Sequence, residues 1–424
     1  MSSLPPHEIA DLKLAGAGAD RMAWAAGQMP VLAQLAERFR QRRPLGGVRV
    51  AACLHVTAET ANLVRALRLA GAEVALCSAN PLATQDEVAA VLVADYGVEV
   101  RARRGEDFES YQEHIASLIS AADPGVPWIT MDDGADLMIG AHQAATPGLE
   151  SLLGGTEETA TGLLRLRRYE EQSGLRCPVL AVNEARTERV LNDRHGTGQS
   201  ALDGIVRASN VLLAGHTVVV VGYGWAGQGV AERARGAGAM VIICEVDPLR
   251  ALEARMAGYE VMPSLEAAAR GDLFITVTGS RRVLRAEHFE RMQDGALLAN
   301  AGHFDVEIDL TELRALADGE PRQVRPLVEQ FELGDGRRLN LLARGRVINL
   351  AAAEGHPAAV MDVSFALQAL SVEALVFDRA GFAPGVQAVP AEIDREVATL
   401  KLAALGVVID APTPEQADYR RNWS

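Results

Sequence analysis

The chain has 424 residues, of which 49% are hydrophobic and 4% aromatic, and its net charge is −15. This length suits two or three domains that each bury a core, and the hydrophobic content excludes a disordered chain. Because an acidic chain repels phosphate backbones and no basic stripe opposes that repulsion, we expect no nucleic-acid partner.

The N-terminus and the cysteines indicate neither export nor a metal centre. The opening segment, MSSLPPHEIADLKLAG, holds no apolar run of signal-peptide length, and nowhere do about 18 apolar residues follow one another. The four cysteines, Cys53, Cys77, Cys177 and Cys244, include no CxxC pair, so neither a disulfide framework nor a zinc site is predicted. We expect a cytoplasmic protein with no metal and no membrane partner.

Strands and helices are predicted to alternate in the first part of the chain. Apolar patterning and glycine stops predict strands at 46–56, 73–80 and 126–134, and helices at 59–71 and 86–97. Such alternation is typical of a parallel sheet, whose functional sites lie at the carboxyl ends of the strands. His55, Asn80 and the pair Asp132–Asp133 are predicted at such ends.

A second alternating unit is predicted over residues 217–310, followed by a helix at 360–376. Its first apolar strand runs into Gly222-Tyr-Gly224-Trp-Ala-Gly227, which matches GxGxxG, and a helix follows. Glu245 ends the next predicted strand, 18 residues after Gly227. A strand, a glycine turn, a helix and an acidic residue in this order are the fingerprint of a dinucleotide site.

The fingerprint also predicts which dinucleotide binds. The glycines let a pyrophosphate approach the helix N-terminus, and Glu245 is expected to accept hydrogen bonds from ribose hydroxyls. A carboxylate at that position repels a 2′-phosphate, so the predicted cofactor is NAD and not NADP. The alternative for the glycine motif is a structural turn in an α/β sheet.

Ordered segments over most of the chain from about residue 46 resemble the S-adenosylhomocysteine hydrolase family. They are CLHVTAET (53–60), NPLATQD (80–86), MDDGADL (131–137), GTEETATG (155–162), GTGQSALDGI (196–205), NAGHFDVEID (300–309) and RGRVINLAAAEGHPAAVMDVSF (344–365). The GTGQS and GWAGQG variants and the short C-terminal end resemble the shorter branch of that family.

The resemblance implies an α/β fold with two doubly wound, Rossmann-like domains and a short C-terminal segment. It implies a discontinuous substrate domain at 1–190 and 351–390, an NAD-binding domain at 191–350, and an oligomerisation segment at 391–424 of a homotetramer. Hinges near residues 190 and 350 would close the domains. Family members hold NAD permanently and oxidise a nucleoside 3′-hydroxyl. A base then removes the 4′ proton, the 5′ substituent leaves, water adds, and the stored hydride returns.

Roles in the family carry over to matching positions of this chain. His55 resembles the acid/base near the leaving group, Asp133 the base for the 4′ proton, and Glu158 the carboxylate that binds the sugar hydroxyls. His303 resembles a further acid/base or sugar contact. Residues that resemble purine contacts are Thr57, Glu59, His356 and Met361. Residues that resemble cofactor contacts are Thr159, Thr161, Asp193, Gly222, Gly224, Trp225, Ala226, Gly227, Glu245, Thr278, Gly302 and Asn349.

Elementary chemistry supports two of these roles and offers an alternative for each. The imidazole of His55 titrates near neutral pH at a predicted strand end, although a lone histidine is more often structural. Like-charge repulsion within the pair Asp132–Asp133 is expected to raise the pKa of one carboxyl, which suits a base. The alternative, which we assign to Asp132, is capping of a helix.

The segment before GTGQS departs from the family. There the family carries a lysine near the 3′-hydroxyl and an Asp-Asn pair before a Tyr-Gly step, whereas this chain reads NEARTERVLNDRHGTGQS (183–200). Glu188 stands at the lysine position, Asn192 begins an inverted pair, and His195 replaces the tyrosine. We expect Glu188 and Asn192 in the catalytic centre, with a buried Glu188 acting as a base and His195 as a further candidate. A solvated helix face is the alternative for Glu188.

Three functions remain open. The altered segment favours a nucleoside dehydratase of the angustmycin type, which eliminates water from an adenine nucleoside to leave an alkene. The first alternative is an S-adenosylhomocysteine or S-inosylhomocysteine hydrolase with a rearranged centre. The second is a non-catalytic paralogue that binds NAD, and the joint retention of His55, Asp133, Glu158 and His303 argues against it.

Overall fold

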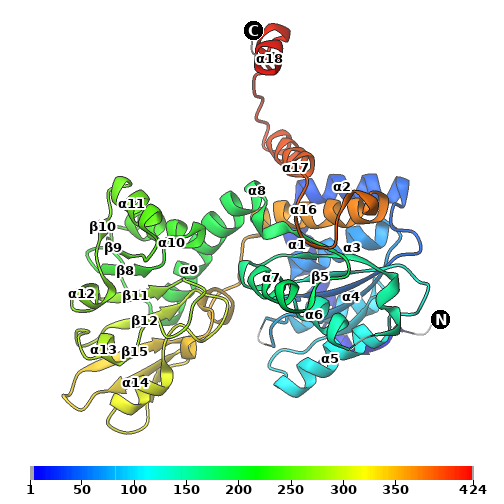
Figure 1. The fold of residues 1–424 in the computed structure, drawn as a ribbon. Helices are drawn as coiled ribbons and strands as arrows, with labels where there is room; N and C mark the ends of the chain where they lie inside the picture. The colour runs from blue at the N-terminus through cyan, green and yellow to red at the C-terminus, as the bar shows by residue number, and fades with distance from the viewer. Residues whose placement is uncertain (1–3, 82, 145, 423–424) are drawn as a thin grey trace.

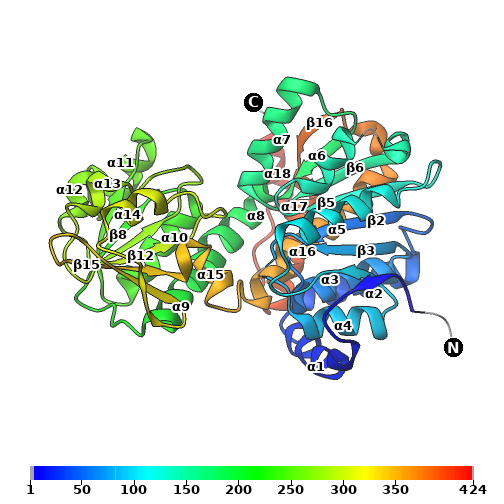
Figure 2. The same cartoon turned by 90° about the horizontal axis from the view of Figure 1, so that it is seen from below.

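The computed structural model describes residues 4–81, 83–144 and 146–422. Two eight-stranded sheets lie in separate lobes, each covered by helices on both faces (Figures 1 and 2). The prediction of two doubly wound α/β domains is therefore confirmed.

The first sheet has the strand order β1-β4-β3-β2-β5-β6-β7-β16, and all its neighbouring strands are parallel. This lobe is built from two separate segments of the chain. The chain leaves it after β7, forms the second lobe and returns to add β16 at the edge of the sheet. The strands are β1 (His7–Glu8), β2 (Arg49–Leu54), β3 (Glu73–Ser78), β4 (Glu99–Arg101), β5 (Trp128–Asp132), β6 (Leu152–Glu157), β7 (Pro178–Ala181) and β16 (Gly385–Ala388).

Apolar side chains on both faces of this sheet are covered by helices. One face packs against α1 (Ala15–Ala26), α2 (Pro30–Arg42), α3 (Ala58–Leu69), α4 (Asp86–Ala94) and α16 (Ala358–Phe377). The other face packs against α5 (Phe108–Ser120), α6 (Asp136–Gln143) and α7 (Ala160–Ser173). The strands and helices predicted between residues 46 and 134 are all present, whereas α1 and α2 were not anticipated.

The second sheet has the order β10-β9-β8-β11-β12-β15-β14-β13. It is parallel from β10 to β15 and continues through the antiparallel strands β14 and β13, which the sequence pattern did not predict. The strands are β8 (Thr217–Val221), β9 (Met240–Cys244), β10 (Glu260–Val261), β11 (Leu273–Thr276), β12 (Leu297–Asn300), β13 (Arg322–Arg325), β14 (Val328–Glu332) and β15 (Arg338–Leu342).

Helices also cover both faces of the second sheet. One core includes α9 (Gly198–Ser209), α10 (Trp225–Gly236), α11 (Pro248–Met256) and α15 (Ile348–Ala351). The other includes α12 (Ser264–Ala268), α13 (Ala286–Phe289) and α14 (Leu310–Leu316). The carboxyl ends of its parallel strands, including the glycine turn after β8, thus remain available for a ligand.

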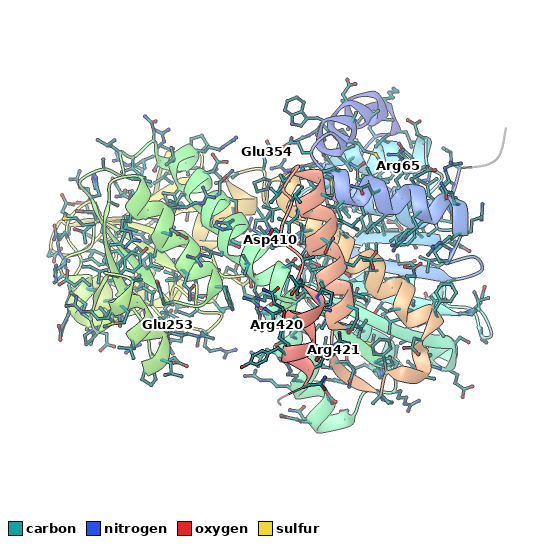
Figure 3. The ribbon with its side chains drawn as sticks, turned by 90° about the horizontal axis from the view of Figure 1, so that it is seen from above. Arg65, Glu253, Glu354, Asp410, Arg420 and Arg421 are labelled. Atoms are coloured by element: carbon teal, nitrogen blue, oxygen red, sulfur yellow. The ribbon has the colours of Figure 1, made fainter. Side chains whose placement is uncertain are left out.

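The chain passes between the lobes twice. The first passage consists of α8 (Arg186–Glu188) and the π-helix η4 (Arg189–Thr197), and the second follows α15, near Glu354 (Figure 3). A Cβ on Gly229 of α10 would lie 1.8 Å from the carbonyl oxygen of Arg194. Glycine therefore lets α10 pack directly against η4, which places the altered segment beside the cofactor lobe.

Helix α16 is a core helix of the first lobe. It is long and apolar enough to cross a membrane by composition alone, yet 67% of its apolar window is buried in this protein. Its Asp362 is fully buried, accepts the N–H groups of Val31 and Leu32 at the start of α2, and lies 2.9 Å from the Lys401 ammonium.

The C-terminal segment has two structurally different parts. Lys401 belongs to α17 (Ala391–Ala404), whose Val397 is buried in the core of the first lobe. The first half of the segment predicted for oligomerisation therefore packs on helices of its own chain. Beyond it, α18 (Pro414–Arg421) stands away from both lobes (Figure 1).

Replacement of Asp362 tests this link between helices. We expect Asp362→Ala to lower the free energy of unfolding by about 3 kcal/mol, because Lys401 and two first-turn amides lose a buried partner. Urea unfolding measures the change, with Asp20→Ala on the exposed face of α1 as the control. Equal stability of both variants would contradict a stabilising role for the Asp362 contacts.

Candidate active site

A cavity of about 1280 Å³ lies between the lobes, at the carboxyl ends of both parallel sheets. All site residues predicted from the sequence line it except Glu188 and Gly227. The residues that line it are His55, Thr57, Glu59, Asp133, Glu158, Thr159, Thr161, Asn192, Asp193, Gly222, Gly224, Trp225, Ala226, Glu245, Thr278, Gly302, His303, Asn349, His356 and Met361.

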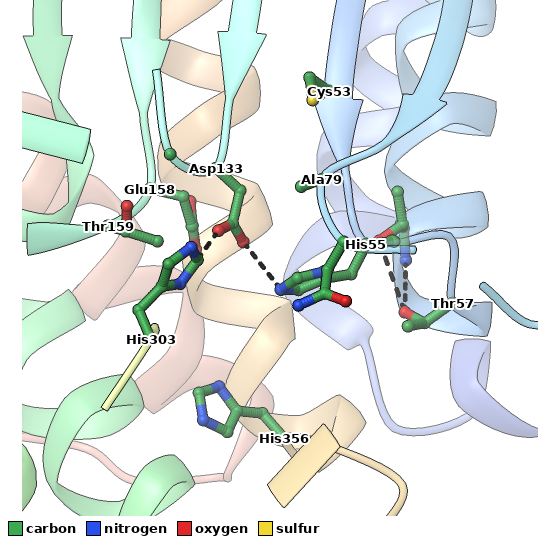
Figure 4. A network of polar contacts seen from close by, with 12 residues as sticks. Cys53, His55, Thr57, Ala79, Asp133, Glu158, Thr159, His303 and His356 are labelled. Carbon is green, nitrogen blue, oxygen red and sulfur yellow. Dashed lines mark hydrogen bonds and ion pairs between the residues drawn. The ribbon is translucent and has the colours of Figure 1, made fainter. Parts of the chain in front are cut away.

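Asp133 lies between two imidazoles in this cavity (Figure 4). His55 follows β2, and its Nε2 is 3.4 Å from Asp133 Oδ2; His303 Nδ1, from the other lobe, is 4.0 Å from Oδ1. The backbone N–H of Asp133 donates to the carbonyl of Cys53, which places the ends of β5 and β2 side by side. The two lobes thus bring an acid/base trio to one point.

Burial keeps two of the site histidines neutral. Desolvation lowers the pKa of His303, against the opposing charge of Asp133. It lowers the pKa of His356 to about 4, with a smaller contribution from His55. Neutral imidazoles accept protons and hydrogen bonds, so both side chains can serve as acceptors near neutral pH.

The adjacent carboxyls Asp132 and Asp133 have different environments. Asp132 is buried and accepts the N–H groups of Leu137 and Met138 in the first turn of α6, which confirms the capping role. Burial raises the pKa of Asp132 to about 7 against the hydrogen bond from the Leu137 N–H, and the charge of Asp136 adds to the rise. The expectation of repulsion within the pair was therefore wrong about the cause.

Two consecutive glutamates end β6. Glu157 is fully buried and accepts the N–H of Gly134, so it holds the loop that carries Asp133. Glu158 points into the cavity and accepts a 2.5 Å hydrogen bond from Gln368 of α16. Burial raises the pKa of Glu158 to about 8, and the charge of Asp133 adds to that effect. Glu157 was not among the predicted site residues, although the two consecutive glutamates in GTEETATG could have indicated it.

Glu188 is a buried residue of the altered segment, so the alternative of a solvated helix face is wrong for it. The Glu188 side chain is only 1% exposed, and its Oε2 accepts a 2.5 Å hydrogen bond from Ser364 of α16. Asn192 lines the cavity and donates to the same hydroxyl at 2.7 Å. Asp193 accepts from Asn183, whereas His195 is exposed and does not line the cavity, which corrects its candidacy.

The second lobe forms a cradle that fits a dinucleotide. Gly222 has a φ of 104°, and a Cβ on Gly227 would lie 2.1 Å from the Gly222 carbonyl oxygen. These glycines let the turn close under the N-terminus of α10, where free amides and the helix dipole bind phosphate. Glu245 follows β9 and accepts the Tyr223 N–H at 2.7 Å, which holds its carboxylate beside the turn.

Thr278, next to the glycine turn, and Asn349 are further residues of the cradle. Thr278 is held by Glu307, which accepts its N–H and hydroxyl. Asn349 donates to Ser200, and its buried Oδ1 has no partner among the described residues. An orphaned buried carbonyl oxygen is a site for a ligand donor, as a carboxamide of nicotinamide would provide.

The opposite end of the cavity holds the residues predicted for the purine. Thr57 caps α3 through a bond from the Thr60 N–H, and burial raises the pKa of Glu59. His356 Nε2 lies 3.2 Å from the hydroxyl of Thr197, a lining residue that was missed although it lies inside GTGQS. Lining residues outside the predicted set include Asn183, Arg189, Ser264, Ser280 and Arg281.

Comparisons with known proteins agree with this geometry. Residues 6–151 match the family described as S-adenosyl-L-homocysteine hydrolase, and residues 193–355 match its NAD binding domain. The adenosylhomocysteinases of Aquifex aeolicus and Gloeobacter violaceus are 54% and 51% identical to this chain over 98% of it, and the match covers 98% and 96% of those proteins. The S-inosyl-L-homocysteine hydrolase of Methanopyrus kandleri is 50% identical over 98% of this chain and 97% of its own.

The chain belongs to the S-adenosyl-L-homocysteine hydrolase family. It is an NAD-dependent enzyme of that family, and its second lobe is the family's NAD-binding domain. The resemblance found in the sequence is confirmed at the level of the family. Its narrower form, an angustmycin-type dehydratase, receives no support from these relatives, whose names favour the hydrolase alternative.

The glycine turn of this hydrolase-family protein gives a test of the cradle. We expect Gly227→Ala to weaken NAD binding by about tenfold or more, or about 1.4 kcal/mol, because its Cβ would displace the Gly222 carbonyl. Calorimetric titration of the apoprotein with NAD measures it. Gly236→Ala in the same helix meets no atom within 4 Å and is the matched control. Unchanged affinity in Gly227→Ala would contradict the placement of the cofactor.

Proposed function

We propose that the enzyme reversibly cleaves S-adenosylhomocysteine to adenosine and homocysteine. The observation that carries the proposal is the position of Asp133 between His55 and His303, in a cavity that also contains the dinucleotide cradle. The full-length relatives at about half identity support this reaction over water elimination.

The residues have chemically consistent roles in such a reaction. Bound NAD would supply hydride acceptance from an alcohol carbon. Oxidation to a ketone acidifies the adjacent C–H, and Asp133 is the carboxylate placed to remove that proton. His55, 3.4 Å away, is the group placed to protonate the departing sulfur and later to deprotonate the incoming water. His303 adds a neutral acceptor from the second lobe.

The purine is the less constrained part of the substrate. Relatives at 50–54% identity include both adenosyl and inosyl enzymes, so adenine and hypoxanthine are both candidates for the purine. Adenine presents an amino donor where hypoxanthine presents a carbonyl acceptor, so the protonation of Glu59 bears on the choice. We favour S-adenosylhomocysteine because the other two relatives named above are adenosylhomocysteinases.

Direct assay of products tests the proposal. We expect the NAD-loaded protein to release adenosine and homocysteine from S-adenosylhomocysteine, as followed by mass spectrometry. S-inosylhomocysteine and an adenine nucleoside with a free terminal hydroxyl, such as psicofuranine, serve as competing substrates. Faster cleavage of the inosyl compound would reassign the purine. Loss of water from psicofuranine without thioether cleavage would overturn the hydrolase.

Replacement of Asp133 separates oxidation from elimination. We expect Asp133→Asn to lower thioether cleavage by about 10²- to 10⁴-fold, as loss of a general base does. Adenosine should still reduce the bound NAD in this variant, since the oxidation step precedes the proton removal by Asp133. Absorbance of reduced nicotinamide and product release are measured on one sample. Equal loss of both would contradict the assignment of Asp133 to the 4′ proton.

A further inference from the structure

A cluster of buried carboxyls without a cation lies beside the proposed reaction centre. Glu158 and Glu188 are 93% and 99% buried, and each has one carboxyl oxygen, Oε1, with no partner among the described residues. Glu158 lines the cavity directly, and Glu188 lies behind it. Both glutamates thus hold acceptor atoms that the fold itself does not use.

Helix α16 brings the two glutamates together. Its Ser364 donates a 2.5 Å hydrogen bond to Glu188 Oε2, and Gln368, one turn later, donates to Glu158 Oε2, so the two carboxyls lie over adjacent turns of one helix. The Ser364 hydroxyl also lowers the pKa of Glu158. Asn192 donates to the same oxygen at 2.7 Å and fixes it in place. A hydroxyl is both donor and acceptor, so Ser364 can pass a proton between the glutamates.

Acidic side chains from several neighbouring elements surround Glu188. Glu158 at the end of β6 and Asp193 of η4 both raise the pKa of Glu188, after burial as the largest cause. From α17, Asp394 binds backbone N–H groups of α8. The nearby Arg189 lies 3.5 Å from Glu184 of the preceding turn, and its charge also lowers the pKa of Asp193.

We propose that Glu158, Ser364 and Glu188 form a bridged carboxyl pair that shares one proton and accepts the hydroxyl proton of the nucleoside as that hydroxyl is oxidised. This rests on the proposed function, because it assigns the proton acceptor of its first step. The substrate O–H bond breaks toward Glu158, the C–H bond breaks toward the bound NAD, and a ketone remains. Glu188 is a positioning residue that acts on Glu158 through Ser364.

Two buried carboxyls can take over the proton transfer that the family assigns to a lysine amine. Two carboxyls in one buried site do not both ionise, as in the dyad of aspartic proteases, so one proton stays between them. Burial and mutual repulsion raise the pKa of both glutamates, which brings a carboxylate base close to the working pH. The same proton is then available when the ketone is reduced at the end of the cycle.

A pH series of single turnovers tests the pair. Adenosine is mixed with the NAD-loaded protein, and the absorbance of reduced nicotinamide gives the oxidation rate. In the wild type the rate should rise with pH along an acidic limb, since one carboxyl must be ionised. In Glu188→Gln the limb should move to lower pH, because Glu158 loses a like charge, and the plateau should fall within about 10²- to 10⁴-fold.

Two further variants separate relay from structure. Ser364→Ala should lower the plateau and move the limb to higher pH, opposite to Glu188→Gln, because both charges remain and the carboxyls lose a hydrogen bond that lowers their pKa values. Glu171→Gln, on the exposed side of α7, is the matched control and should change neither. A limb that stays in place in Glu188→Gln, with or without a lower rate, would overturn the proposal. A purely structural role predicts the same fractional loss of the oxidation rate at every pH.

An infrared readout on the substrate-free protein is independent of turnover. The wild type should keep the C=O band of a protonated carboxyl at neutral pH, and Glu188→Gln should reduce it; absence of the band in the wild type would overturn the proposal. Failure of S-adenosylhomocysteine cleavage with a shifted limb would reject the proposed substrate and leave the pair standing. Cleavage of S-adenosylhomocysteine with an unshifted limb would support the proposed substrate and reject the carboxyl pair.

Discussion

Exclusion of water from carboxyl groups is the constraint on which this site depends. The carboxyl ends of two parallel sheets face one cavity, so side chains that end strands are brought together and lose solvent at the same time. Desolvation is the largest cause of the raised pKa values of Asp132, Glu158 and Glu188, and of the lowered pKa of His303. One physical effect therefore favours the uncharged form of the acids and of the histidine alike.

The fold treats its buried carboxyls in two ways. Asp132, Glu157 and Glu307 each accept backbone N–H groups, which compensates for the lost hydration and fixes the loops around the cavity. Glu188 accepts only from a side-chain hydroxyl among the described contacts. Carboxyls of the first kind build the site, and those of the second kind remain free to exchange protons.

The sequence predicted β2, β3, β5, β8 and β9 and the residues at their carboxyl ends, because parallel strands and glycine turns leave periodic and local signals. It missed α1, α2 and the antiparallel strands, whose placement depends on tertiary packing. The burial of Glu188 was equally invisible, because it follows from the seating of α8 against α16 and α17 and from no pattern within the segment itself. Asp132 shows the intermediate case: its capping role was predicted, but the cause of its raised pKa was not.

The composition of the chain narrows the chemistry left to that buried segment. Lysine occurs only at Lys13, which is exposed, and at Lys401, which pairs with Asp362. Arginine supplies nearly all other positive charge, and a guanidinium does not release its proton in proteins. Proton transfer at the cavity therefore falls to imidazoles and carboxyls. His55 and His303 flank Asp133, and the carboxyl groups of Glu158 and Glu188 lie beside that trio, so these groups move protons in the site without a lysine amine.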